Sequence, residues 1–364
     1  MTFVIFLGVL SVLVLIHEFG HFAAAKIFGI KVEEFALGLP FTKPIFKFVF
    51  GETQYAVYPL LFGGFVKLYG EDTKVQEHKG SKDFGRDFWT RGKKQRMLVL
   101  VAGILMNVVL SLCLFVALYL VIGVPSETKN LVTVNLVEAR SPAQVAGLKT
   151  GDRITNVATT TEFSKLTKDY AGKKMVLNVR RGETIALFEG IVEKDTQTLE
   201  IPVTPRVNPP AGQGALGVSI SEYPYVMTSR RGNVLVASFK ATVAWGGRIL
   251  DGFRSIGKSL LAGQKPEGVA GPIGIYQLTG VVAGEGILPL MELVAILSLN
   301  LAVFNILPIP ALDGGRIFFV WLEWVRRKRV SPQLESKINA WGMAVLLGLI
   351  ALISLQDVIR LYWK

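Results

Sequence analysis

The chain has 364 residues, of which 51% are hydrophobic and only 19% charged, and its formal net charge is +12. This balance excludes a pair of ordinary soluble domains and indicates a polytopic α-helical membrane protein that carries some soluble mass. The basic residues fall mainly in loops beside apolar segments, without a stripe of interleaved aromatics, so the charge favours a membrane and excludes nucleic acid as a partner.

Four apolar stretches are near or above the roughly 20 residues that a helix needs to cross a bilayer. They cover Phe3–Phe28, Met97–Val124, Ile287–Pro310 and Ile338–Leu355. Basic residues precede the second stretch and follow the third, and the positive-inside tendency makes that side cytoplasmic. Both termini, and the long segment between the second and third spans, are then expected outside the cytoplasm.

The expected organisation follows the chain. It comprises a first transmembrane helix at 1–28, a β-rich membrane-associated segment with a basic loop at 29–96, a second helix at 97–124, an extracytoplasmic domain at 125–222, an amphipathic helix with a linker at 223–286, a third helix with a cytoplasmic loop at 287–336, and a fourth helix at 337–364.

The first span contains His17-Glu18-Phe19-Gly20-His21, an H-E-x-x-H motif. Two histidines four residues apart project from one face of a helix, which suits two ligands of one zinc ion, and Glu18 can act as general base on a metal-bound water. The alternative is a set of satisfied polar residues that face a bundle interior. Ionisable side chains are costly in a bilayer, which favours the metal site. The remaining histidine, His78, is expected to be solvated in a polar loop.

A catalytic zinc needs a third protein ligand and one open position. With no other plausible histidine, a carboxylate must supply it, and the best candidate is Asp313 in Asn305-Ile-Leu-Pro-Ile-Pro-Ala-Leu-Asp313-Gly-Gly. The first and third spans run in the same direction, so His17, His21 and Asp313 fall at similar depth. The alternative for Asp313 is a cap or turn residue before the two glycines.

These paired motifs resemble the site-2 protease family of intramembrane zinc metalloproteases, most closely its bacterial regulator-of-sigma-E protease branch. The resemblance covers nearly the whole chain. It implies that His17, His21 and Asp313 bind Zn2+, that Glu18 activates water, and that Asn305 holds substrate or stabilises the oxyanion. For Asn305 the alternative is a polar contact between helices. The family likeness also places the chain in a bacterial inner membrane.

The segment Glu33–Glu71 contains two short β-prone runs that are broken by Pro59 and Gly63-Gly64. This resembles the family's membrane-dipping β-hairpin beside the active site. A free strand edge there, near Gly63 and Gly64, could pair with a substrate helix that has unwound. The alternative is a plain cytoplasmic sheet.

The run from Ser141 to Ile154 resembles the turn and helix of bacterial PDZ domains, and Met175–Arg180 and Leu199–Thr204 read as its strands. The later Leu216 and Gly217 resemble a carboxylate-binding loop placed last in the domain, where backbone amides could hold a peptide C-terminus. The alternative is a generic β-hairpin. In contrast to the tandem pair of the best-known relatives, the chain carries a single PDZ-like unit.

Between Asn233 and Leu261, apolar residues recur at near-helical spacing with basic residues among them. This pattern predicts a helix on the outer membrane surface, or alternatively an amphipathic helix packed on the PDZ-like domain.

The leading functional hypothesis is zinc-dependent proteolysis of single-span membrane proteins after a first cut by another protease, as in the release of a transcription regulator or the clearance of signal-peptide remnants. A non-proteolytic scaffold is the second hypothesis, but a scaffold gains nothing from Glu18 beside two metal ligands. A serine protease is excluded because no histidine remains for a Ser-His pair.

Overall fold

The computed structural model describes two compact units. The first is formed by Met1–Phe115 together with Ser238–Lys364 and the second by Val116–Ala237; we call them the helix unit and the β unit. The described residues are 1–71, 83, 85–127, 132–188, 190–210, 212–223, 225–228, 232–264, 271–328 and 330–362. His78 lies outside them.

Within the described ranges, four helices are long and apolar enough to cross a membrane, in agreement with the sequence prediction. They are α1 (Thr2–Ile27), α2 (Lys93–Ile122), α7 (Ile287–Ile306) and α9 (Pro332–Tyr362). Both α2 and α9 begin earlier than the apolar stretches that predicted them. Lysine, arginine and glutamine are good helix formers although they are too polar to belong to a hydrophobic stretch, so each helix begins before its apolar stretch does.

The third apolar helix ends earlier than predicted. α7 stops at Ile306, and Leu307 has an extended backbone with φ −63° and ψ 140°. Pro308 and Pro310 prevent a continuation because proline lacks an N–H and disfavours helical backbone in the residue before it. A new helix, α8 (Asp313–Arg326), then occupies a region that the sequence suggested was a loop.

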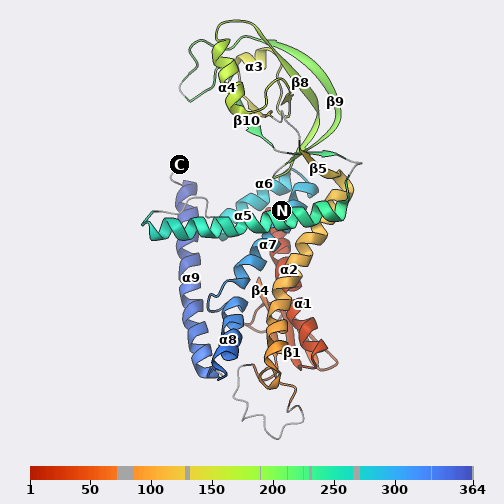
Figure 1. Cartoon of the computed structure of the whole chain (residues 1–364), viewed down its shortest axis with the longest axis vertical. Helices are drawn as coiled ribbons and strands as arrows, with labels where there is room; N and C mark the ends of the chain where they lie inside the picture. The colour runs from red at the N-terminus through yellow and green to blue at the C-terminus, as the bar shows by residue number, and fades with distance from the viewer. Residues whose placement is uncertain are drawn as a thin grey trace. The chain divides into compact units, whose positions relative to one another are not determined.

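The predicted amphipathic helix is α5 (Val234–Leu261), which in Figure 1 lies across the direction of α9 and α2. Phe253 of α5 stacks on Phe304 of α7 with 5.9 Å between ring centroids. One apolar side chain of α5 therefore packs within the helix unit, whereas others such as Phe239 and Val243 are exposed.

The expected linker after α5 contains a further helix, α6 (Pro272–Gly284). Its N-terminus is capped from outside, because Asp357 of α9 accepts hydrogen bonds from the amides of Gly271 and Gly274 at 3.0 and 2.9 Å. A carboxylate at a helix N-terminus satisfies amides that have no intrahelical partner. This contact joins α9 to α6.

The segment after α1 forms a sheet that contains a hairpin of β2 and β3, with strand order β2-β3-β1-β4. Its strands are β1 (Val32–Leu39), β2 (Phe46–Phe50), β3 (Thr53–Val57) and β4 (Leu60–Leu68). β1 pairs in parallel with β3 and antiparallel with β4. The expected break at Gly63-Gly64 is wrong: both lie inside β4, where the missing side chains admit close neighbours. Pro59 does separate β3 from β4.

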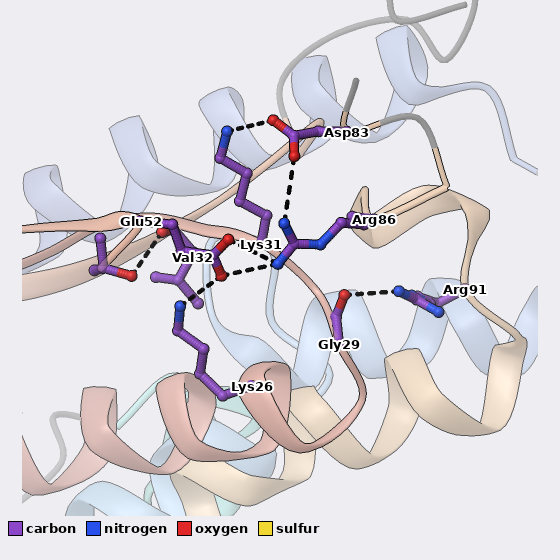
Figure 2. A network of polar contacts seen from close by, with 9 residues as sticks. Lys26, Gly29, Lys31, Val32, Glu52, Asp83, Arg86 and Arg91 are labelled. Atoms are coloured by element: carbon purple, nitrogen blue, oxygen red, sulfur yellow. Dashed lines mark hydrogen bonds and ion pairs between the residues drawn. The ribbon is translucent and has the colours of Figure 1, made fainter. Parts of the chain in front are cut away.

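A network of charges holds this sheet against the end of α1 (Figure 2). Glu52, at the β2–β3 turn, accepts from Lys26 of α1 at 2.8 Å and from Arg86 at 2.7 Å. Arg86 also reaches Asp83 at 3.3 Å, and Asp83 pairs with Lys31 at 2.5 Å. The turn, the start of β1 and the approach to α2 are thereby tied to the helix that carries the H-E-x-x-H motif.

The β unit is built on a sheet with strand order β10-β6-β7-β8-β9-β11-β5. Its strands are β5 (Val124–Glu127), β6 (Val132–Val137), β7 (Arg153–Ile154), β8 (Met175–Ala186), β9 (Gly190–Val203), β10 (Val218–Glu222) and β11 (Tyr225–Thr228). The unit extends beyond the predicted 125–222, because β11 pairs with β5 and with β9.

Two short helices, α3 (Pro142–Val145) and α4 (Thr160–Asp169), complete the β unit. Ser141 caps α3, and Gly147 follows it at φ +84°, a conformation that favours glycine. β10 is an edge strand, and its Glu222 accepts from the backbone amide of Thr160 at the start of α4 at 3.1 Å. An open strand edge therefore lies beside a helix.

Candidate metal centre

Two histidines on α1 present their ring nitrogens to one point. His17 and His21 are one helical turn apart and buried, with 7% and 9% of their surfaces exposed. Their Nε2 atoms lie 3.2 Å apart. The turn between them passes very close to α2: a Cβ on Gly20 would run into the carbonyl oxygen of Ala102. The close approach of the two backbones requires glycine there, as is common where membrane helices pack tightly.

Asp313, the first residue of α8, completes the group. Its Oδ2 lies 2.9 Å from Nε2 of His17 and 3.2 Å from Nε2 of His21. The next residue could not carry a side chain, because a Cβ on Gly314 would meet the backbone of Ile306 and Leu307 at the end of α7. The tight turn after α7 thus brings the carboxylate to α1, and the structure brings together three side chains of types that can hold a metal ion.

The donor set fits zinc. Nδ1 of His21 lies 2.8 Å from the backbone oxygen of Val99; since a carbonyl only accepts, Nδ1 carries the proton and Nε2 of a neutral ring offers a lone pair. That lone pair faces Nε2 of His17 and a carboxylate oxygen at about 3 Å, and the three atoms repel one another unless a proton or a metal ion lies between them. Ligand atoms of a tetrahedral zinc with bonds of about 2.0–2.1 Å are separated by about 3.3 Å, close to the distances observed.

Glu18 and the sheet meet beside this group. A Cβ on Gly64 of β4 would lie 3.3 Å from Cγ of Glu18, 2.8 Å from a methyl of Val14 and 2.9 Å from the oxygen of Ala36. β4 therefore passes directly alongside Glu18. Gly63 faces the other way, against the side chain of Leu39. Of the two glycines predicted to bind substrate, the structure brings only Gly64 into contact with the motif.

Asn305, on the last turn of α7, also reaches the centre. Its Nδ2 lies 3.5 Å from Nε2 of His17, and the residue is 8% exposed. An amide donor at this distance from the ligand atoms can serve a developing oxyanion. The alternative role as a polar contact between helices is compatible with the same distance, since His17 belongs to α1.

Leu216 and Gly217 belong to the β unit and take no part in this centre. The Leu216 side chain is 1% exposed and packs in the core of that unit. Gly217, at φ +67°, donates its amide to the oxygen of Gly214 at 3.0 Å. These two residues form the turn before β10.

The sequence analysis did not identify the contribution of α2. Besides the Val99 carbonyl, Asn107 places its amide 3.2 Å from Nδ1 of His17, and a Cβ on Gly103 would run into the ring of His21. The available signal was the pattern Gly103-x-x-x-Asn107, a small and a polar residue one turn apart inside a predicted span.

Known proteins are similar to this chain over nearly its whole length. The model of peptidase family M50 matches residues 5–349. The chain is 33% identical over 355 residues to a Clostridium perfringens protein named as a zinc metalloprotease, with 96% of each chain covered. It is 28% identical over 444 residues to the regulator of sigma-W protease RasP of Bacillus subtilis, with 99% of each covered.

The chain belongs to peptidase family M50. As a member of this family of site-2 proteases, it is an intramembrane zinc metalloprotease. The predicted family, enzyme class and Zn2+ cofactor are confirmed, and the apolar helices agree with a location in the membrane.

Proposed function

We propose that His17, His21 and Asp313 hold the zinc ion of this M50 protease and that Glu18 is its general base. The observation that carries this proposal is the convergence of two Nε2 atoms and one carboxylate oxygen within 3.2 Å of one another. Zinc, when bound there, makes a water molecule more acidic and polarises the scissile carbonyl.

Side chains of the protein then transfer the proton and stabilise the developing charge. Glu18 accepts a proton from the water that attacks the carbonyl carbon, and returns it to the amide nitrogen as the C–N bond breaks. Asn305 offers its Nδ2 hydrogens to the carbonyl oxygen as negative charge develops on it.

The substrates in this proposal are single-span membrane proteins, cut within or near the transmembrane helix after a first cleavage by another protease. A helical peptide bond is poorly exposed, so the segment must unwind. β4 is an edge strand of its sheet among the described residues, and it passes beside Glu18. Its edge, including Gly63 and Gly64, could pair with the extended segment. Anti-sigma factors and signal-peptide remnants are the substrate types that we favour.

The β unit in this proposal is PDZ-like and lies outside the cytoplasm. The edge strand β10 beside α4, preceded by the turn at Leu216 and Gly217, supports a groove for a peptide C-terminus. Such a groove would admit substrates that have already been shortened. The protein would sit in a bacterial inner membrane with both termini outside and the active site towards the cytoplasm. α5, with its exposed apolar side chains and interspersed basic residues, would lie on the outer membrane surface.

The test is cleavage of a truncated single-span reporter by the purified full chain in detergent, with zinc content measured in parallel. We expect Glu18→Gln to retain zinc and to lose cleavage by at least about 10³-fold, as expected for the loss of a general base and its proton transfers. Asp313→Asn should lose both zinc and cleavage, since a neutral amide is a poor zinc ligand.

Asp251→Asn is the matched control, because Asp251 lies on the exposed side of α5, paired only with Arg254 among the described residues. It removes the same charge and should change neither quantity. Equal cleavage and equal metal content in all the variants would overturn the assignment of Glu18 as the general base and of Asp313 as a zinc ligand.

A further inference from the structure

The two histidines of the metal centre have different partners behind them. His21 directs Nδ1 to the backbone oxygen of Val99 at 2.8 Å. His17 directs Nδ1 to the side-chain amide of Asn107, two turns further along α2, at 3.2 Å. Both contacts are buried, and Asn107 has no exposed surface. Each ring thus meets one polar group on the side away from the metal-binding nitrogens.

The chemistry of the ring decides what Asn107 must offer. A neutral imidazole that binds a metal through Nε2 carries its proton on Nδ1 and needs an acceptor there. The structure has the amide nitrogen Nδ2 facing the ring, so that two donors meet, while the buried oxygen Oδ1 has no partner among the described residues. Half a turn of the amide exchanges the two atoms and gives Nδ1 its acceptor.

The backbone of α2 is anchored at the same residue. Ser298 of α7 donates its hydroxyl to the carbonyl oxygen of Asn107 at 2.8 Å, which fixes this turn of α2 against α7. The amide of Asn107 therefore starts from a restrained position. A restrained acceptor sets both the rotation of the His17 ring and the nitrogen that carries the proton.

We propose that Asn107 is a positioning residue of the zinc site: its Oδ1 accepts the Nδ1 proton of His17, as the carbonyl of Val99 does for His21. The inference rests on the ligand set proposed above. It also makes the two histidines unequal, because a side chain secures one ring and the main chain of α2 secures the other. Removal of such partners typically lowers metal affinity about 10- to 100-fold.

The experiment compares zinc affinities of purified full-chain variants by competition with a chromophoric chelator. Asn107→Leu keeps the size of the side chain but removes the acceptor, and its affinity should fall about 10- to 100-fold. Asn107→Asp keeps an acceptor and should stay within a fewfold of wild type. Ser111→Ala is the matched control: Ser111 lies one turn further along α2, equally buried and with no partner for its hydroxyl in the described part of the chain. It should leave the affinity unchanged.

Each pattern of results decides the question. Equal affinities in Asn107→Leu and Ser111→Ala would overturn the proposal, as would an equal loss in the Leu and Asp variants, which would indicate packing alone. If Asn107→Leu does not fold, Asn107→Ala takes its place with the same expectation. Asp313→Asn distinguishes failure of the ligand set from failure of the Asn107 proposal. If Asp313→Asn binds zinc as wild type does, the proposed ligand set is wrong. If it loses zinc while Asn107→Leu does not, only the role of Asn107 is wrong.

Discussion

The two units of the molecule differ in how they distribute polar and apolar residues. In the helix unit, polar side chains such as His17, Asn107 and Ser298 are buried, whereas Val345 and Leu352 on α9 are 69% and 61% exposed. In the β unit, the interior is a conventional apolar core around residues such as Leu177. Lipid is as apolar as leucine, so burial of leucine does not by itself drive helices together in a membrane, and the interior accommodates small and polar residues beside apolar ones such as Leu293 and Leu299.

This difference indicates which interactions stabilise each unit. The β unit depends on apolar area removed from water. The helix unit adds to its apolar contacts the close approach of backbones and a few directed polar contacts, and some of those polar contacts lie at the proposed metal centre. Mutations that enlarge or empty a buried position should therefore act on different observables in the two units.

The largest effect is expected in the core of the β unit. Leu177 has no exposed surface, and Leu177→Ala should lower the free energy of opening of that unit by about 2–5 kcal/mol through lost burial and a cavity. Hydrogen exchange of the β-unit amides in the full chain measures this. Zinc content should not change. Val176→Ala, at a neighbouring position that is 47% exposed, should cost much less. A parallel loss of zinc in Leu177→Ala would contradict the expectation that the core of the β unit and the zinc site respond to mutation independently.

An intermediate effect is expected where α1 meets α2. Gly20→Ala should force the helices apart, because the new methyl group meets the backbone of Ala102 and Gly103; overpacking of this kind costs about 1–3 kcal/mol. The shift also moves His21 relative to the Val99 carbonyl, so zinc affinity should fall by about tenfold or more, equivalent to ~1.4 kcal/mol.

Gly8→Ala is the control for this substitution, since a Cβ at Gly8 of the same helix meets nothing within 4 Å. Alanine improves helix propensity by a similar amount at both positions, so propensity cancels from the comparison. Equal zinc affinities in the two variants would mean that the close approach of α1 and α2 does not support the site.

The smallest effect is expected in the charge network of Figure 2, because its members are partly exposed and such pairs contribute about 0–1 kcal/mol. The pKa of Glu52 lies below its ordinary value of 4.5 because Lys26, and then Arg86, donate to the carboxylate. The stabilisation is therefore complete above the ordinary pKa and is lost as the pH falls through the lowered one.

Glu52→Gln should slightly reduce the exchange protection of the β3 amides at pH 7, and the difference from wild type should vanish at strongly acidic pH. Glu285→Gln, an exposed change outside the sheet, should have no effect on β3. A difference that persists unchanged below the carboxylate pKa would show that the contribution of Glu52 is not ionic.

Local patterns in the sequence predicted much of this molecule. Hydrophobic length predicted the four apolar helices, and the H-E-x-x-H spacing placed His17 and His21 on one face of α1. The strand pattern at Met175–Arg180 falls inside β8, and the pattern at Leu199–Thr204 covers the end of β9, which stops one residue earlier at Val203. Helix ends were less well predicted, because α2 continues into polar residues that still favour a helix.

Other features were decided only by the tertiary structure. Asp313 was a candidate ligand from its motif, but its distance to the histidines depends on the turn between α7 and α8. The parallel pairing of β1 with β3 and the approach of Gly64 to Glu18 are contacts between distant segments. The Val99 carbonyl has no signature in any sequence, because every residue has one. Sequence patterns record what a residue needs from its own helix or strand; which partner it meets across the fold depends on how those elements pack.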